Sequence, residues 1–116
     1  MSVVEQYARA HIVTDADRVA EDTAVPVVLR YDPEEPRAVR VGLPDRREWT
    51  FPRTLLEQGL RAPTGTGEVR VWPCGRVQVV VEFHSAHGVS VVQFESKTLL
   101  RFLRRTYTAT AQPVSR

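Results

Sequence analysis

Short apolar runs rich in valine alternate along this chain with turn residues, at a spacing of about eight to twelve residues. This spacing is typical of antiparallel β-structure, in which alternate side chains face the same side of a strand. In the first half, four strands are predicted over residues 7–14, 25–31, 37–43 and 47–51. A short helix is predicted next, over residues 52–58, with Gly59 as a left-handed stop.

The second half is predicted to repeat this order of strands followed by a helix. Residues 61–67 are expected to form a loop whose glycines adopt positive φ. Three strands should follow, over residues 68–72, 76–83 and 89–94, and then a helix over residues 97–107 with Leu99, Phe102 and Leu103 on its apolar side. The expected fold class is α+β, with antiparallel sheets in two strands-then-helix repeats, because only one helix lies between predicted strands.

The length and composition predict one compact domain over residues 1–116, with an ordered core over residues 6–108. Cys74 is the only cysteine, so no internal disulfide is possible. The N-terminus lacks the pattern of a secretory signal. The longest apolar run, residues 24–29, is far shorter than the ~20 residues of a membrane span. We therefore expect a cytoplasmic protein without membrane insertion.

The charge balance is mildly basic, with 16 lysine and arginine residues against 14 aspartate and glutamate residues and a net charge of +2. All the basic residues except Lys97 are arginines. This small excess falls well short of the phosphate-tracking surface that tight DNA binding requires. An ordinary solvated surface accounts for most of the arginines.

No residue pattern predicts a catalytic or metal site. Cys74 and His84 lie at opposite ends of a predicted strand, about 30 Å apart, so these two residues and His87 cannot together hold a zinc ion. The local sequence places no base partner beside Cys74. The run PTGTG at residues 63–67 lacks the lysine of a phosphate-binding loop and precedes a strand. We expect no cofactor and no enzymatic activity.

Single-stranded nucleic acid is the alternative ligand. Arg70 and Trp72 share one strand face, and aromatic and basic groups on an open sheet can stack bases. One side of the C-terminal helix is also basic, with Lys97, Arg101, Arg104 and Arg105. A protein contact for Trp72 and a solvated helix face account for the same residues, and we prefer these two interpretations.

Apolar residues occur on both faces of the predicted strands in the second half. One face of an antiparallel sheet usually points to water and is polar, so this excess predicts a contact with another protein or with a second copy of the chain. The residues expected at this contact are Arg70, Trp72, Val80, Val92 and Phe94. The alternative is a monomer in which the two helices lie across this face.

One block of the sequence resembles a known family. Residues 25–41 read VPVVLRYDPEEPRAVRV, and residues 48–73 read EWTFPRTLLEQGLRAPTGTGEVRVWP. An apolar strand ending in LRYD, a short Leu-Leu helix, a PTGTG loop and a VRVWP strand follow one another in this block. This order is similar to the central signature of the SsgA-like proteins. The resemblance covers residues 9–108, less closely in the C-terminal half.

The resemblance implies a role in sporulation-linked cell division of actinobacteria. It implies that the chain helps to position or activate septation, with recruitment to division septa and with FtsZ and other SsgA-like proteins as partners. It also implies a fold like that of the Whirly single-strand binders and assembly as a homotrimer. We therefore expect a non-enzymatic division protein that acts through protein contacts, with single-stranded nucleic-acid binding as the alternative.

Overall fold

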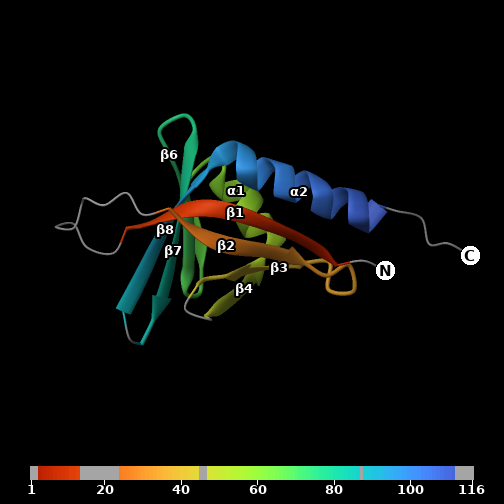
Figure 1. Cartoon of the computed structure of the whole chain (residues 1–116), viewed down its shortest axis with the longest axis horizontal. Helices are drawn as coiled ribbons and strands as arrows, with labels where there is room; N and C mark the ends of the chain where they lie inside the picture. Colours follow the sequence, from red (N-terminus) through yellow and green to blue (C-terminus); the bar gives the residue numbers. More distant parts are fainter. Residues whose placement is uncertain (1–2, 14–23, 45–46, 87, 112–116) are drawn as a thin grey trace, which may run out of the picture.

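The computed structural model of the chain describes residues 3–13, 24–44, 47–86 and 88–111. Within these ranges the chain forms eight strands and two helices, and each helix follows four strands in the sequence (Figure 1). The elements are β1 (Val4–Val13), β2 (Ala24–Tyr31), β3 (Ala38–Gly42), β4 (Glu48–Pro52), α1 (Arg53–Gly59), β5 (Thr64–Thr66), β6 (Val69–Cys74), β7 (Gln78–Ser85), β8 (Gly88–Glu95) and α2 (Ser96–Ala111). The α+β fold class, with a short and a longer helix, is confirmed.

All eight strands belong to one antiparallel sheet, in the order β4-β3-β2-β1-β8-β7-β6-β5. The two halves of the chain therefore share a single sheet. They are joined by the pairing of β1 with β8, which runs from His11↔Gln93 to Val13↔Val91. This junction is short, and Figure 1 shows the strands of the first half crossing β6–β8 at a large angle. The sheet is consequently strongly curled.

The strand β5 was not predicted. Residues 61–67 were expected to form a loop, whereas Thr64 to Thr66 pair with β6, from Thr64↔Val71 to Thr66↔Val69. Of the two glycines in this run only Gly67 has a positive φ, at 58°. Glycine is unfavourable in strands, so the local sequence does not predict this one. The pairing with β6 makes the segment a strand.

The core lies between the inner face of the curled sheet and the two helices. Alternate residues of the predicted strands point into it as expected, and six of them on β2 and β7 are at most 1% exposed: Val27, Leu29, Tyr31, Val79, Val81 and Phe83. The helices add their predicted apolar residues, Leu55, Leu56, Leu99, Phe102 and Leu103. Neither helix in the described part of the chain has the length and apolar content required to span a bilayer.

Aromatic rings from β4 and β7 contact each other in the core, because the sheet curls. Four strands separate β4 from β7 in the sheet order, so a flat sheet would hold the two strands about 24 Å apart. In the curled sheet the ring of Trp49 stacks on that of Phe83, with centroids 4.9 Å apart, and Phe51 lies 6.2 Å from Phe83. Aromatic pairs of this kind add about 0.5–1.5 kcal/mol beyond their buried area.

The role of Gly59 differs from the predicted one. Helix α1 ends at Gly59, but the residue does not have a positive φ, and Leu60 caps the helix in a right-handed conformation. Glycine is required here because β6 passes very close to the helix. A Cβ at this position would lie 2.1 Å from Val71 Cγ1 and 3.2 Å from the Val71 carbonyl carbon.

The ordered elements extend beyond the predicted core of residues 6–108 at both ends. Strand β1 begins at Val4, and α2 continues to Ala111. Some predicted features lie outside the described residues. These are Thr14 at the end of the first predicted strand, turn residues 45–46, His87 and residues 112–116.

Candidate functional site

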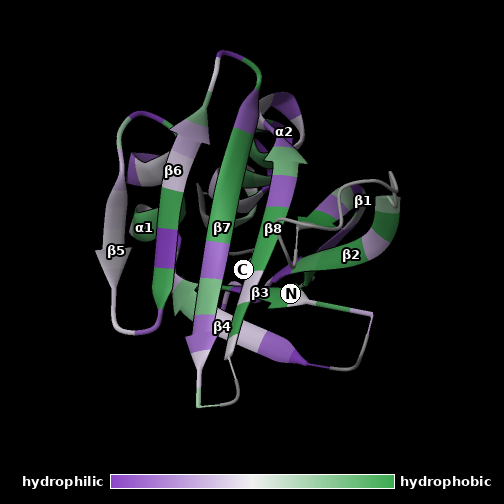
Figure 2. Cartoon of the chain, turned by 90° about the vertical axis from the view of Figure 1, so that its left-hand side faces the viewer, coloured by the Kyte–Doolittle hydropathy of each residue, from purple (hydrophilic) through white to green (hydrophobic). Residues whose placement is uncertain are grey.

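The outer face of β6–β8, turned away from both helices, carries part of the predicted interface (Figure 2). Antiparallel pairing places Trp72 beside Val80, and Arg70 beside Glu82 and then Val91. Val80 is covered by its neighbours and only 7% exposed, whereas Val89 is 47% exposed. We call this surface the outer β6–β8 face and define it by Arg70, Trp72, Val80, Glu82, Val89 and Val91. Neither described helix covers it.

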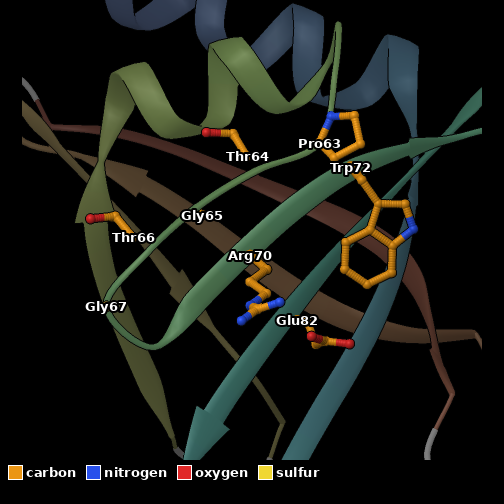
Figure 3. Close-up of a pocket in the computed structure, with 8 residues that line it drawn as sticks. All are labelled: Pro63, Thr64, Gly65, Thr66, Gly67, Arg70, Trp72 and Glu82. Atoms are coloured by element: carbon orange, nitrogen blue, oxygen red, sulfur yellow. The ribbon is translucent and has the colours of Figure 1, made fainter.

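A pocket of about 600 Å³ opens on this face, next to the edge of the sheet (Figure 3). Its walls are the side chains of Arg70, Trp72 and Glu82, and its floor is the segment of residues 63–67. Gly65 pairs with Arg70, so Gly65 takes the outward position of β5 (Thr64–Thr66), and Pro63 and Gly67 flank the strand at its two ends. The pocket is open on this side because the outward residue of β5 is a glycine, which places no side chain beside Arg70.

The two charged groups in the pocket are not paired with each other. Glu82 Oε1 lies 2.7 Å from Nε2 of His84, two residues along the same strand. Arg70 is exposed, and no carboxylate of the described residues forms an ion pair with its guanidinium. The pocket therefore presents a cationic group that is available to an external anion.

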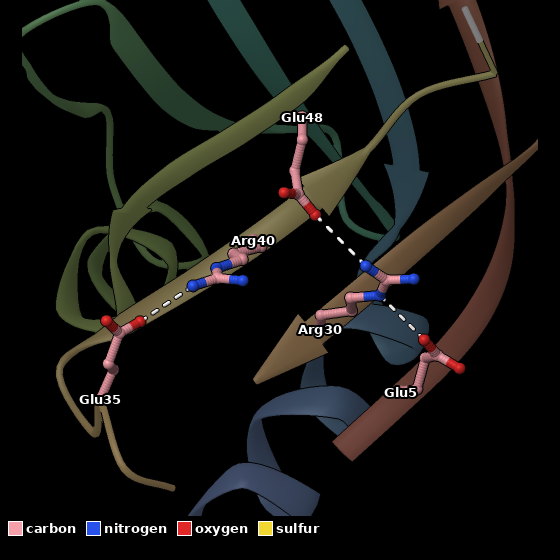
Figure 4. A network of polar contacts seen from close by, with 5 residues as sticks. All are labelled: Glu5, Arg30, Glu35, Arg40 and Glu48. Carbon is pink, nitrogen blue, oxygen red and sulfur yellow. Dashed lines mark hydrogen bonds and ion pairs between the residues drawn. The ribbon is translucent and has the colours of Figure 1, made fainter. Parts of the chain in front are cut away.

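The outer face of the first half has a different chemistry (Figure 4). Arg30 Nε lies 2.8 Å from Glu5 Oε2, and Arg30 Nη1 lies 3.6 Å from Glu48 Oε2. Arg40 Nη2 lies 3.0 Å from Glu35 Oε1. These side chains are 39–59% exposed, so the pairs are solvated and contribute little to stability. These three pairs are therefore hydrated charges that neutralise each other, whereas Arg70 in the pocket has no such partner among the described residues.

Val92 and Phe94 do not belong to the outer face, and this part of the predicted interface is wrong. Val92 pairs with Val81 and Phe94 with Val79, so both side chains point inward and are 0% and 1% exposed. The segment 89–94 carries apolar residues at both parities. Its own alternation therefore could not tell the two faces apart, and the pairing with β7 decided the orientation.

The basic residues of α2 lie on the opposite side of the molecule from Arg70 and Trp72. Helix α2 packs on the inner face of the sheet, and Lys97, Arg101, Arg104 and Arg105 are exposed on its outer side. Arg105 also donates to the Glu5 carbonyl oxygen and to Gln6 Oε1, at 3.3 and 3.2 Å. The two predicted nucleic-acid surfaces therefore do not form one continuous surface.

The described residues contain no group of three His, Cys, Asp or Glu side chains that could hold a metal ion. Cys74 is exposed at the end of β6. His84 is engaged with Glu82, and His87 lies outside the described residues.

A second polar cluster, which was not predicted from the sequence, connects the two helices. Arg53 Nη1 donates to Tyr31 Oη at 3.2 Å and to Thr106 Oγ1 at 3.3 Å. The Arg53 guanidinium carbon also lies 3.9 Å from the centre of the Tyr107 ring, in the geometry of a cation–π contact. Tyr107 donates a hydrogen bond to Glu57 Oε2. The cluster joins the start of α1 to the end of α2, and no signal in either segment alone predicted it.

Burial raises the pKa of the Tyr107 phenol above its ordinary value of 10.0, and the hydrogen bond to Glu57 raises this pKa further, while the charge of Arg53 opposes the change. A raised pKa means that the folded state favours the protonated phenol. The contribution of the protonated Tyr107 phenol to folding stability is therefore fully present below the unfolded-state pKa, near 10. This contribution is lost as the pH rises through the higher folded-state pKa.

We expect Tyr107→Phe to be less stable than the wild type at neutral pH, and this difference to shrink as the pH rises above about 10. Urea unfolding of the wild type and the variant, from neutral pH to above pH 10, would measure this difference in the free energy of unfolding. All other titrating groups are the same in the two proteins. A difference in stability that stays constant through pH 11 would show that Tyr107 ionises equally in the folded and unfolded states.

A family described as Streptomyces sporulation and cell division protein, SsgA, matches residues 25–113 of this chain. The sporulation-specific cell division protein SsgB of Streptomyces coelicolor is 42% identical over 89 residues, which cover 71% of this chain and 65% of that protein. The match thus spans just under two thirds of the relative's length. SsgB of Salinispora tropica is 38% identical over 124 residues, which cover 97% of this chain and 86% of that protein.

Two solved structures have a similar fold. One, from work on SsgB mutations that correlate to longitudinal cell division during sporulation of Streptomyces coelicolor, superimposes with a TM-score of 0.77 at 33% identity, covering 93% of this chain and 86% of the other. The other is an SsgA-like sporulation-specific cell division protein from Thermobifida fusca, with a TM-score of 0.76 at 30% identity, covering 96% and 85%.

Proposed function

This chain belongs to the SsgA family of sporulation and cell division proteins, and on that premise we propose that it acts at division septa by binding other proteins, without catalysing a reaction. The family match over residues 25–113 carries the proposal. The relatives at 38–42% identity named above are cell division proteins. We therefore expect this chain to act in sporulation-specific cell division as well.

The outer β6–β8 face supports binding as the mode of action. It combines a partly buried tryptophan, an exposed Arg70 and the exposed Val89 on a sheet that no described helix covers. Tryptophan and arginine are enriched among residues that dominate binding energy at protein interfaces. The partners we propose are FtsZ, other SsgA-like proteins and further copies of this chain, assembled as a homotrimer.

We expect a two-hybrid assay against FtsZ and the SsgA-like proteins of the host to recover a division protein, and Trp72→Ala to weaken that interaction about tenfold or more. Val89→Arg is a second variant on the same face, in case Trp72→Ala disturbs folding. The matched control is Tyr7→Ala, because Tyr7 is a 69% exposed aromatic residue on the outer side of β1.

A deletion strain that septates normally, together with the absence of any division partner, would refute the proposed function. The homotrimer is tested separately by light scattering coupled to size exclusion. A species near 13.1 kDa at tens of micromolar would be a monomer and would exclude the trimer.

A further inference from the structure

The two edges of the sheet differ in how they are protected. The edge strand β4 carries Glu48 and ends in Pro52, and both charge and proline discourage further strand pairing. The opposite edge, β5, is protected only by its length of three residues, because Thr64–Thr66 is uncharged and Gly65 and Thr66 are exposed. In the described part of the chain no element lies beyond β5 (Figure 2). Its outer backbone groups are therefore open to an additional strand.

The outer surface of β5 also leaves room for a partner's side chains. Gly65 occupies its outward position, and Pro63 and Gly67 flank the strand, next to the pocket of about 600 Å³. A Cβ on Gly65 would lie 3.0 Å from Arg70 Cγ, so the stem of Arg70 lies directly across the glycine. A strand added beside β5 would be about 4.8 Å from Gly65. A long side chain on that strand could reach the Arg70 guanidinium across the bare glycine.

The charges in the pocket indicate which side chain would fit. Arg70 has no ion pair among the described residues, while Glu82, the nearest carboxylate in the pairing, is engaged with His84. A carboxylate binds a guanidinium through short, charge-assisted hydrogen bonds. Trp72 and Pro63 form the apolar part of the pocket lining. This lining suits a partner strand with an apolar residue two positions from its carboxylate residue, because alternate residues of a strand share a face.

We propose that the β5 edge binds an extended acidic segment of another protein, which adds to the sheet as a further strand. Its backbone would pair with Thr64–Thr66, a glutamate or aspartate would bind Arg70, and an apolar side chain would pack on Trp72 and Pro63. Main-chain pairing supplies affinity in this mode of recognition, and pockets for alternate side chains supply specificity. The inference rests on the proposed function only in taking the partner to be a protein.

The test uses the full chain and displayed libraries of short random peptides that differ only in a fixed central residue, which is glutamate, glutamine or lysine. The wild type should enrich peptides of the glutamate library. A synthetic fluorescent peptide from that selection should bind Arg70→Glu at least about tenfold more weakly. Arg70→Glu should in turn select from the lysine library. Hydrogen exchange should slow at Thr64–Thr66 when the peptide is bound.

Two further variants separate the site from general charge effects. Gly65→Ala fills the bare position and should also weaken the peptide, although it leaves every charge in place. Arg101→Glu removes an exposed arginine of α2, on the other side of the molecule, and should bind the peptide like the wild type. Equal enrichment from the glutamate and lysine libraries, or an equal loss of affinity in Arg101→Glu, would overturn the proposal.

Other occupants of the edge would give different results. If Arg70→Glu lowers the mass in light scattering and does not change peptide affinity, a second copy of this chain occupies the edge. If a single-stranded oligonucleotide displaces the peptide with submicromolar affinity, the site binds nucleic acid. Either result contradicts the inference. Septation restored by Arg70→Glu in a deletion strain, with no selected peptide in vitro, would refute the acidic-strand site and leave the role in cell division intact.

Discussion

Phe83→Ala is expected to lower the free energy of unfolding by about 3–5 kcal/mol, which approaches the whole stability of a small domain, about 5–15 kcal/mol. Phe83 is 0% exposed and contacts rings from the far edge of the sheet, with Trp49 stacked on it at 4.9 Å. The cavity left by alanine cannot collapse easily, because its lining residues belong to strands held in place by the curl. Urea unfolding followed by tryptophan fluorescence measures the loss.

Two further variants show how much of the loss of stability in Phe83→Ala is due to the cavity. Phe83→Leu keeps most of the volume and should cost about 1.5 kcal/mol or less, so the gap between the variants reports the cavity. Val77→Ala is the matched control, because Val77 is 67% exposed in the turn before β7, and its effect should stay within about 0.5 kcal/mol. If Phe83→Ala unfolded at the same urea concentration as the wild type, the aromatic contact between β4 and β7 would not form.

Gly59→Ala is expected to destabilise the protein by about 2 kcal/mol or more, although the same change usually stabilises a helix by about 1 kcal/mol. The added Cβ would lie 2.1 Å from Cγ1 and 2.4 Å from Cβ of Val71. Val71 is fully buried, so it cannot move aside, and forcing extra volume into a packed core typically costs about 1–3 kcal/mol, occasionally more. The steric cost exceeds the gain in helix propensity.

Gly42→Ala provides the control for Gly59→Ala. Gly42 lies in β3, and a Cβ there would meet Val28 at 3.8 Å, an ordinary contact. We expect this variant to unfold within about 0.5 kcal/mol of the wild type. If both alanine variants behave alike, the close approach of α1 to β6 is not present in solution.

Strands that bury one face could be predicted from the sequence, and a strand with two apolar faces could not. On β2 the buried residues Val27, Leu29 and Tyr31 alternate with less buried ones, so the pattern itself indicates the inner face. On β8 the run of residues 89–94 is apolar at both parities. Val92 and Phe94 were consequently placed on the wrong side, although the strand itself was predicted correctly.

The candidate site was predicted in part. Arg70 and Trp72 were correctly placed on one strand face, because that conclusion needs only their spacing of two residues. The pocket was missed, since it forms only when residues 63–67 pair with β6 and expose their glycines beside Arg70. The alternation of proline and glycine at positions 63, 65 and 67 was the available signal, and it was interpreted as a loop.

The sequence by itself determined the order of seven of the eight described strands and of both helices, the antiparallel α+β class and the apolar faces of β2, β3, β7 and α2, because strand alternation and helical periodicity are properties of consecutive residues. Only the tertiary structure decided the single curled sheet, the open edge at β5, the orientation of β8 and the need for glycine at position 59. Each of these depends on a partner far along the chain, such as Val71 for Gly59 or Val81 for Val92. Such contacts form because they lower the free energy of the whole packed domain. The residues next to a position in the sequence therefore do not indicate which distant residue it will contact.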